Sequence, residues 1–481
     1  MAVEALGDVV LEVQNELDDT AGSHVARREI VMMAVARLQQ LVETPATTDR
    51  VRRKHVLAHM QLGALHADLG ERPQAHAEFL LGYDLAKRAV EANPASDRAR
   101  AALLTMGVMR GESEYYFREN FPEAERLFLQ AVTGFQELAD KLRAHADGDP
   151  DLPQPERLPL FNAENSLADA CERLSKVYAN HKQLSKWDAA RSVEWVKKSV
   201  AIRERLVAAK PTPDLRSRLA ISYQHLGYVA FKENDLPGCI ARYEEDLKQY
   251  LAILKDRPTS LKVKRRVADA EFRLGDVVHY VGQRERALEL YTDGLKWAEQ
   301  VRWSEPENPW YRAAVCQGHY CVATALPKAE REQALGHWRE ALKLREELYR
   351  ELEAKGSVRH QDKIALGLTL ARCGEVKRAA AVADALRPKA DPRELSEEVA
   401  SIYGLCMAAV QGDRALDRLT PEERKLRDHY QELALATLKE GVAKGFKGYI
   451  YLEGDADYEP LRALPEFRAW LAEYKKGLKQ E

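Results

Sequence analysis

The feature that most constrains how this chain can fold is an internal repeat, because residue types that recur at a fixed spacing mark one structural unit used several times. Four segments superpose without gaps on a Leu-Gly pair, which begins at Leu62, Leu226, Leu274 and Leu366. In every copy a Gly or Asn follows the Leu by eight residues, and a small residue follows it by thirteen. An aromatic residue follows by seventeen in three of the four copies. This agreement predicts a helical hairpin that recurs along the chain.

Each repeated position has a physical role in such a hairpin. The Gly of the Leu-Gly pair lets a neighbouring helix approach closely, which must outweigh a helix-propensity cost of roughly 1 kcal/mol. The Gly or Asn eight residues later suits the left-handed conformation that ends a helix. We expect the small residue to mark the closest point between the two helices. We expect the aromatic residue to fill the space between one hairpin and the next.

Helical periodicity supports the same interpretation. Apolar residues between positions 263 and 281 step by four, three, four, three and four, which places them on one face of an α-helix. No sustained period-two alternation, the pattern of half-buried strands, runs through the chain. The sequence therefore predicts an all-α protein.

Three further units fit the pattern with short insertions. Their reference positions are Met106, Leu174 and Gln317, and neighbouring reference positions along the chain lie 43 to 68 residues apart. This period is longer than the roughly 34 residues of a minimal two-helix repeat. Proline residues fall between the units, where a helix must stop. They are Pro94, Pro211, Pro213, Pro258, Pro306 and Pro309.

These observations predict a right-handed α-solenoid of about seven to eight helical hairpins with a capping segment at each end. We expect an N-terminal helical cap over residues 1–45 and the first two units over 46–146. A Pro-rich stretch over 147–160 is expected to form an extended surface loop, because proline disrupts helices. Units three to eight then occupy 161–445. A C-terminal segment over 446–481, which breaks the period, is expected to cap the last hairpin.

Composition excludes several function classes. Lys and Arg number 73 against 76 Asp and Glu, so no global field favours nucleic acid or an anionic membrane. No run approaches the ~18 apolar residues of a membrane-spanning helix. The six cysteines are scattered singly, which is typical of small core residues in a reducing compartment. We therefore expect a cytoplasmic protein without membrane insertion.

The Leu-Gly spacing resembles that of the tetratricopeptide repeat (TPR) family, over roughly residues 50–450. Two end segments narrow the resemblance. The stretch from Leu17 to Ser23, followed by Ala26-Arg27-Arg28-Glu29, resembles the lead-in after the kinase domain of many large bacterial serine/threonine protein kinases. The stretch from Asp455 to Phe467 is similar to the D-x-D-x-x-P-L-R-x-x-P-x-F ending of the same repeat regions. No kinase motif is present, so the resemblance is to the non-catalytic part of such proteins only.

The chain shows no catalytic or cofactor-binding motif, and we expect neither enzymatic activity nor a cofactor. The nearest approach to a metal site is His55, His59 and His66, which share one face of a predicted helix. A metal needs three or four converging ligands, and His66 falls where the repeat usually has a core Tyr. Packing is therefore the favoured interpretation, and metal binding the alternative. Asp455 and Asp457 suggest a calcium loop only superficially, because its Gly and final Glu do not follow in register.

The binding surface of such a solenoid is expected on its concave side, which the first helix of each hairpin lines. Charged and amide side chains mix there with aromatic residues, which dominate binding energetics in protein interfaces. The candidate partner-binding residues are Glu172, Lys176, Asn180, Gln224, Tyr228, Phe231, Phe272, Asp276, His279, Tyr280, Arg312 and His319. An equally weighted alternative is that the aromatic residues are covered by a neighbouring segment, because exposed apolar patches are uncommon on monomers.

The corresponding positions of the first two units are apolar, for example Leu57, Met60, Leu104 and Val108. An apolar groove should not face water, so we expect the N-terminal cap to close this end. The leading functional hypothesis is a non-catalytic scaffold that binds another protein or peptide, and not nucleic acid, in the groove of units three to six. The alternative is a sensory or regulatory module of a serine/threonine kinase system, which the resemblance implies.

Overall fold

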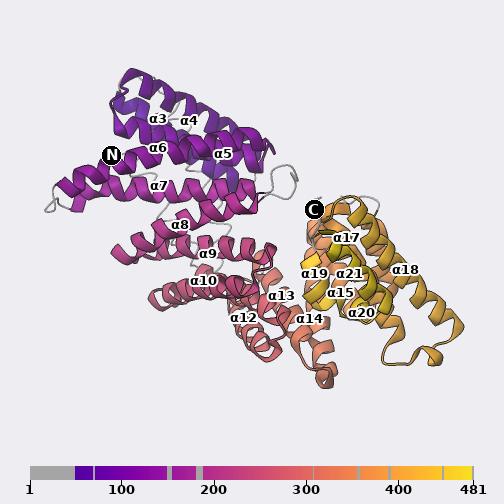
Figure 1. Ribbon diagram of the computed structural model, residues 1–481. Helices are drawn as coiled ribbons and strands as arrows, with labels where there is room; N and C mark the ends of the chain where they lie inside the picture. Colours follow the sequence, from indigo (N-terminus) through magenta and orange to yellow (C-terminus); the bar gives the residue numbers. More distant parts are fainter. Residues whose placement is uncertain are drawn as a thin grey trace. The chain divides into compact units, whose positions relative to one another are not determined.

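The computed structural model describes residues 49–68, 71–148, 154–179, 188–306, 308–354, 358–387, 392–446 and 449–478 (Figure 1). Every regular element within these ranges is a helix, as the sequence predicts. The chain divides into two compact units, each containing several of the predicted hairpins. Residues 1–263 are called the first unit below, and residues 264–481 the second. The predicted N-terminal cap lies outside the described residues. None of the described helices is long and apolar enough to cross a membrane.

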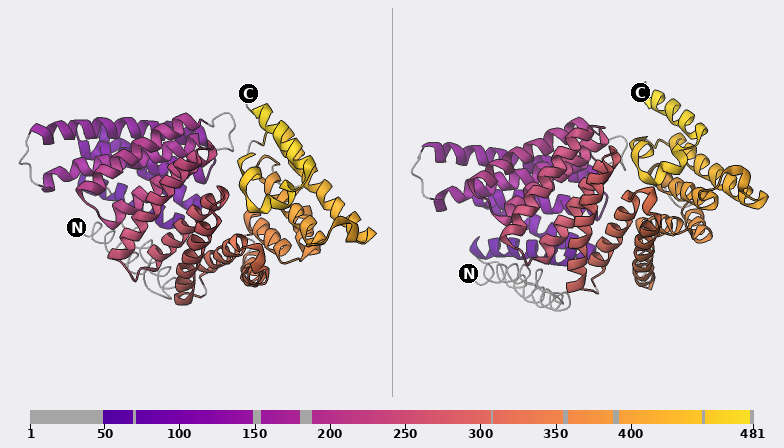
Figure 2. Two further views of the ribbon diagram at one scale, coloured as in Figure 1. Left: turned by 60° about the horizontal axis from the view of Figure 1, so that its bottom comes forward. Right: turned by 90° about the horizontal axis from the view of Figure 1, so that it is seen from below.

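The first unit contains four consecutive helical hairpins, in which each helix packs on the next one along the chain (Figure 2). The helices are α3 (Asp49–Asp68), α4 (Arg72–Ala92), α5 (Asp97–Tyr116), α6 (Phe121–Gly148), α7 (Gln154–Tyr178), α8 (Ala189–Ala209), α9 (Pro213–Lys232) and α10 (Leu236–Asp256). Residues 147–160, predicted to form an extended loop, are helical up to Gly148 and again from Gln154. Pro155 takes the second position of α7, where the missing N–H has no intrahelical partner to lose.

The second unit continues the hairpins and ends in shorter helices. Helix α11 (Leu261–Tyr280) begins just before the boundary between the units. It is followed by α12 (Arg284–Ser304), α13 (Pro309–Ala325), α14 (Arg331–Ala354), α15 (His360–Arg372), α16 (Val376–Leu386), α17 (Pro392–Gln411), α18 (Pro421–Ala443), α19 (Tyr449–Gly454), the 3₁₀ turn η3 (Ala456–Tyr458), α20 (Glu459–Arg462) and α21 (Pro465–Leu478). The described helices α3 to α18 thus form eight hairpins, and the predicted helical repeat architecture is confirmed. The right-handed course stays a prediction.

The repeated glycines make room for aromatic rings. A Cβ atom added to Gly227 would lie 2.5 Å from the Tyr243 ring, and one added to Gly275 would lie 2.6 Å from the Tyr291 ring. These rings therefore pack on the first helix of their own hairpin. This corrects the expectation that they fill the space between one hairpin and the next, because each ring occupies the room that the glycine of its own hairpin leaves.

The copy without an aromatic residue solves the packing differently. The residue seventeen positions after its Leu366 is Ala383, and a Cβ on its Gly367 would meet Ile402 of the next hairpin at 2.7 Å.

The helix-ending positions follow the prediction, since Asn234, Gly282 and Gly374 have φ values of 60°, 84° and 81°. This left-handed conformation ends a helix and starts a tight turn.

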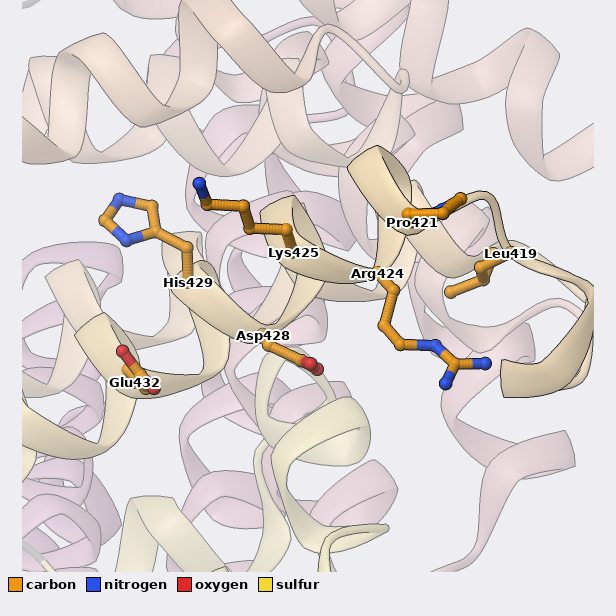
Figure 3. Close-up of a pocket in the computed structure, with 7 residues that line it drawn as sticks. All are labelled: Leu419, Pro421, Arg424, Lys425, Asp428, His429 and Glu432. Atoms are coloured by element: carbon orange, nitrogen blue, oxygen red, sulfur yellow. The ribbon is translucent and has the colours of Figure 1, made fainter.

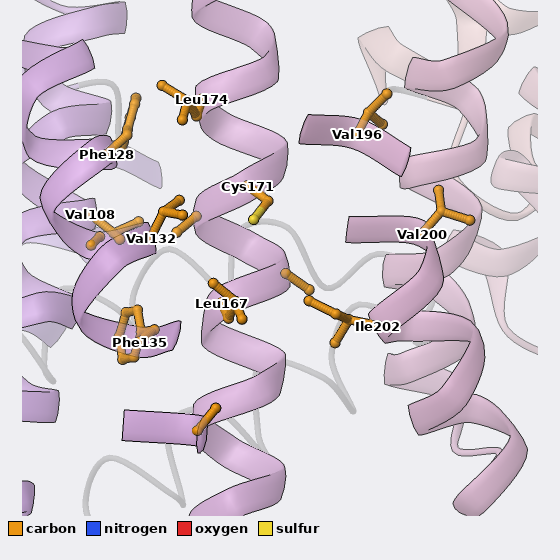
Figure 4. Close-up of a cluster of buried hydrophobic side chains, with 14 of the residues drawn as sticks. Val108, Phe128, Val132, Phe135, Leu167, Cys171, Leu174, Val196, Val200 and Ile202 are labelled. Carbon is orange, nitrogen blue, oxygen red and sulfur yellow. The ribbon is translucent and has the colours of Figure 1, made fainter. Parts of the chain in front are cut away.

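Each unit has its own hydrophobic core. In the first unit, side chains of α5 and α6 meet α7 and α8 in one cluster that includes Phe128, Phe135, Leu167 and Val196 (Figure 4). Cys171 lies within this cluster, as predicted for the cysteines, and burial raises the pKa of its thiol to about 12. In the second unit, the largest cluster joins α15 to α18 with the C-terminal helices.

The C-terminal segment belongs to that second core. Leu452, Leu461 and Phe467 are completely buried, and Trp470 and Tyr474 of α21 pack against the same cluster. A Cβ on Gly404 of α17 would meet Leu461 at 2.8 Å, which shows how closely α20 approaches α17. This packing fixes the segment from α19 to α21 on the last hairpin.

Candidate functional site

The three histidines of α3 do not converge on one point. His59 Nδ1 lies 2.6 Å from Glu78 Oε2, and His66 Nδ1 lies 2.6 Å from Glu71 Oε2. Each of these buried imidazoles thus has its own carboxylate partner. In the part of the chain that the structure describes, no three His, Cys, Asp or Glu side chains are arranged to hold a metal ion.

In the first unit, the predicted groove residues of α7 belong to a buried ionic network. Glu172 is 4% exposed and pairs with Arg203 of α8 and, at 2.8 Å, with Lys176. Burial alone would raise the pKa of Glu172, but the positive charges of Arg203 and Lys176 outweigh it and hold this pKa well below its usual range. Glu172 is therefore engaged in ion pairs within the first unit and is not itself open to a ligand. Asn180 lies outside the described residues.

The ionic contacts continue from helix to helix. Arg173 Nε of α7 donates to Glu112 of α5 at 2.7 Å, and Arg218 of α9 donates to Asp169 of α7 at 2.8 Å. Arg203 also bonds Asp169, so α8 joins the same network. We refer to Glu112, Asp169, Glu172, Arg173, Arg203 and Arg218 as the charge ladder. It ties the first helices α5, α7 and α9 together by paired charges.

The predicted groove residues of α9 lie beside the ladder and are partly exposed. They are Gln224, Tyr228 and Phe231. The Lys232 ammonium lies 5.6 Å from the centre of the Tyr228 ring, a cation–π distance. His225 of the same helix bonds Ser175 Oγ of α7 at 2.9 Å, and burial lowers its pKa to about 4.

In the second unit, two predicted groove residues are buried. Phe272 is 5% exposed because its ring fills the space above Gly294, where a Cβ would approach it to 2.6 Å. Arg312 is 6% exposed, and its two terminal nitrogens each lie 2.6 Å from a different oxygen of Glu351. Neither side chain faces an open groove, because each satisfies a packing or charge requirement within the unit.

The other predicted polar residues of this unit make contacts within the unit. Asp276 is exposed and accepts a hydrogen bond from the Tyr291 hydroxyl at 2.8 Å. His319 Nδ1 lies 2.8 Å from His337 Nδ1, and burial, helped by His337, lowers the pKa of His319 to about 4. His279 is partly exposed, and burial lowers its pKa as well.

The chain's own C-terminal segment packs against α11, α13 and α15. The Tyr280 ring lies against Gly454, at the end of α19, so closely that a Cβ there would overlap it. Asp457 accepts the Tyr320 hydroxyl at 2.6 and 2.8 Å and the Arg372 guanidinium at 2.6 Å. Residues 454–459, the C-terminal acidic turn, therefore contact α13 and α15. For Tyr280 and Phe272, the alternative that aromatic residues are covered describes the structure.

Sequence reasoning missed Tyr320 and Arg372 as contact residues. The signal for Asp457 was present in the D-x-D-x-x-P-L-R stretch, which was interpreted only as a cap. Its partners lie 137 and 85 residues away along the chain, beyond the reach of any local pattern. Burial, helped by the Asp457 charge, raises the pKa of Tyr320 well above its usual value, so this hydroxyl remains a donor.

A surface hollow of about 730 Å³ lies at the start of α18 (Figure 3). Its lining residues come from one helix and the loop before it: Leu419, Pro421, Arg424, Lys425, Asp428, His429 and Glu432. The side chains spread along the helix and carry both signs of charge. A ligand site needs groups that converge from several elements, and this hollow does not provide them.

No family model and no curated protein matches the chain. Among solved structures, the apo form of RapI is similar with a TM-score of 0.51 and 12% identity, over 93% of this chain and 99% of that one. A Rap protein complexed with competence and sporulation factor gives a TM-score of 0.47 and 10% identity, and the match covers 92% of this chain and 99% of that one. A signal transduction ATPase with a tetratricopeptide repeat sensor, from Pyrococcus horikoshii, gives a TM-score of 0.41 and 13% identity. This match covers 88% of this chain and 55% of that one.

At these identities the likeness concerns the fold alone. The similarity to RapI extends over almost the whole of both chains, so the arrangement of hairpins is a TPR-like helical repeat. The resemblance of the two end segments to kinase-associated repeat regions stays a prediction.

Proposed function

We propose that this chain is a non-catalytic scaffold that binds a peptide or a domain of another protein on the first-helix face of its first unit. The observation that carries the proposal is the joint placement of Lys176, Gln224, Tyr228 and Phe231. All four lie on the neighbouring first helices α7 and α9, and all four are partly exposed. A cation, an amide and two aromatic rings supply the contacts that peptide recognition uses.

The charge ladder gives this surface a rigid base. Arg203 is 2% exposed and contacts Glu172 and Asp169 of α7 and Ser222 of α9, which fixes the spacing of the two helices. A surface that is already ordered loses less conformational entropy when a partner binds. Rigid helices therefore support binding by a few partly exposed side chains.

Two further observations support a binding role over catalysis. The thiols of Cys171, Cys316 and Cys373 have pKa values raised by burial to about 12, 11 and 11, so they are poor nucleophiles at neutral pH. All six cysteines are free, which supports our proposal of a reducing, cytoplasmic location.

The proposal is tested by affinity purification from the native host with the full chain as bait. We expect Tyr228→Ala/Phe231→Ala to reduce recovery of a specific partner by ten-fold or more, because aromatic residues dominate such interfaces. Leu251→Ala is the matched control, since Leu251 is a 43% exposed apolar side chain on the second helix α10. Equal recovery with all three baits, checked for folding by circular dichroism, would remove the groove from consideration.

A second candidate is a regulatory module of a serine/threonine kinase system. The resemblance of the stretches Leu17–Ser23 and Asp455–Phe467 to kinase-associated repeat regions favours it. The decisive measurement is phosphorylation of a generic substrate by a kinase recovered with the bait, with and without added purified chain. Unchanged phosphorylation would leave the scaffold as the only candidate.

A further inference from the structure

The C-terminal acidic turn joins parts of the second unit that lie far apart along the chain. Its Gly454 lies against the Tyr280 ring of α11, and its Asp457 accepts the Tyr320 hydroxyl of α13 across 137 residues. In a helical repeat protein each hairpin contacts chiefly its neighbours. These two contacts are therefore additional to the packing that the repeat itself supplies.

The turn has a second, separate attachment to the last hairpin. The Tyr458 hydroxyl donates to the main-chain carbonyl of Glu397 on α17, and Leu461 packs against Gly404 of the same helix. Neither attachment involves α11 or α13. The segment from α19 to α21 can therefore stay on α17 while the turn separates from α11 and α13.

The contact with α11 brings like charges together. The Asp455 carboxylate accepts the backbone N–H of Asp457 at 2.8 Å, and Asp276 of α11 acts on Asp455 as a further negative charge. The two guanidinium groups of this region are engaged by other atoms. Arg372 donates to the Asp457 carboxylate and Arg462 to the main-chain carbonyl of Asp455, each at 2.6 Å. Closure thus places Asp455 beside two carboxylates, and like charges disfavour its ionised form.

The titratable and charged groups that face Asp455 come from five elements. They are Asp457 and Tyr458 of η3, Arg462 of α20, Asp276 of α11, Tyr291 of α12 and Arg372 of α15. Burial, helped by the Asp457 charge, raises the pKa of Asp455 to about 7. In water the pKa of an aspartic acid is near ~3.9. The closed turn therefore holds a proton that the open turn releases.

This proton sets the direction of the pH dependence. Below about pH 4 Asp455 is protonated in both states, and closure is strongest. Closure then weakens by up to about ten-fold per pH unit, because only the closed state still holds the proton. Above about pH 7 Asp455 is ionised in both states, and its effect is complete.

We propose that the C-terminal acidic turn is a pH-sensitive switch, which is closed on α11 and α13 in acid and opens as pH rises toward neutral. Ionisation of Asp455 beside Asp457 and Asp276 drives the opening, and α19 to α21 remain on the last hairpin. Opening makes the Tyr280 ring, one of the predicted partner-binding residues, accessible. The switch belongs to the second unit and is independent of the function proposed for the first.

The test is hydrogen exchange of the full chain between pH 5 and pH 7.5, corrected for the intrinsic pH dependence of exchange and followed by mass spectrometry. Local opening lowers the protection of the segment that opens. We expect the protection of residues 454–459 to fall at least ten-fold over this range. The decisive variant is Asp455→Asn, which keeps an oxygen for the Asp457 N–H and removes the charge. Its protection should change far less with pH.

His279 of α11 faces Asp457 and Glu459, and burial lowers its pKa, so it also titrates in acid. The unaltered chain and the Asp455→Asn variant both contain His279. The difference between their pH profiles therefore belongs to Asp455. A Glu271→Gln variant should keep the pH dependence of the turn, which separates the switch from a change in the stability of the whole unit.

A steric variant opens the turn without any titration. A Cβ on Gly454 would lie 2.1 Å from the Tyr280 ring, so Gly454→Ala should lower the protection of residues 454–459 already at pH 5. The matched control is Gly477→Ala on α21, where a Cβ meets nothing within 4 Å. This control should exchange as the unaltered chain does.

Three results would overturn the proposal. The first is a protection of residues 454–459 that does not change with pH, and the second is an equal pH profile for the Asp455→Asn variant. The third is a Gly454→Ala variant that loses protection equally in α17 and α18. This last result would make the turn an inseparable part of the core of the second unit.

Discussion

Single glycines in this chain differ in what an added methyl group would meet. A Cβ on Gly227 would lie 2.5 Å from the Tyr243 ring, whereas one on Gly336, in the second turn of α14, would meet nothing within 4 Å. The overpacking cost of roughly 1–3 kcal/mol at Gly227 opposes a gain in helix propensity of roughly 1 kcal/mol. We expect Gly227→Ala to lower the free energy of unfolding and Gly336→Ala to raise it by about 0.5–1 kcal/mol. Urea unfolding measures both, and effects of the same sign would contradict this account.

Part of this residue-level detail was predictable from spacing. The recurrence of Gly63, Gly227 and Gly275 sixteen residues before an aromatic residue indicated a repeated helical hairpin. It did not indicate which cavity the ring fills, because sequence spacing specifies a helix face but not the depth of the neighbouring groove. The buried positions of Phe272 and Arg312 escaped prediction for the same reason.

One buried carboxyl group makes the stability of the second unit depend on pH. Glu271 of α11 is 7% exposed, and burial, helped by the charge of Asp293, raises its pKa to about 8. The folded state therefore holds a proton that the unfolded state, with a pKa near ~4.3, releases. Stability from this group is present at low pH and is lost as pH rises through about 8.

We expect the melting temperature of the unaltered chain to fall between pH 6 and pH 9, and Glu271→Gln to reduce that fall. The matched control is Glu285→Gln, an exposed position on α12. Differential scanning calorimetry at several pH values measures the slopes. Equal slopes for all three proteins would show that Glu271 is ionised throughout the range.

At the level of helices, Arg203 is the contact that joins α7, α8 and α9. Its removal leaves Glu172 buried without its strongest partner, which costs about 3–5 kcal/mol for a buried pair. We expect Arg203→Met to destabilise the first unit by this amount. Arg205→Met, on the same helix but 57% exposed, should cost less than about 1 kcal/mol. Chemical denaturation followed by circular dichroism compares the two, and similar losses would mean that the charge ladder contributes little.

The helices themselves were largely predictable, because their ends carry explicit signals. Pro213 and Pro309 occupy the first helical position of α9 and α13. Asn234 follows the end of α9 and Gly282 the end of α11, and both residues have the left-handed conformation. The contacts of the C-terminal acidic turn were not predictable. They depend on tertiary packing between segments that share no local pattern, as the pairing of Asp457 with Tyr320 shows.

At the scale of the whole molecule, the two units have separate cores. Phe128 is 2% exposed in the core of the first unit, and Phe467 is completely buried in that of the second. Replacing a buried Phe by Ala costs about 3–5 kcal/mol. We expect Phe467→Ala to accelerate hydrogen exchange in α17, α18 and α21 while α5 to α8 keep their protection. Phe128→Ala should have the converse effect.

Mass spectrometry of deuterated peptides resolves these regions. If either substitution accelerated exchange equally along the whole described chain, the molecule would unfold as one cooperative body. The repeat architecture leads us to expect the local response, because each hairpin contacts chiefly its neighbours.

The pairing of Asp457 with Tyr320 and Arg372 also sets an order of events during synthesis. A ribosome adds roughly 5–20 residues per second, so the 137 residues between Tyr320 and Asp457 take on the order of ten seconds to emerge. During that interval the first unit is already outside the ribosome and its hairpins can close. Until Asp457 emerges, the Tyr320 hydroxyl and the Arg372 guanidinium lack the carboxylate that pairs them in the folded chain.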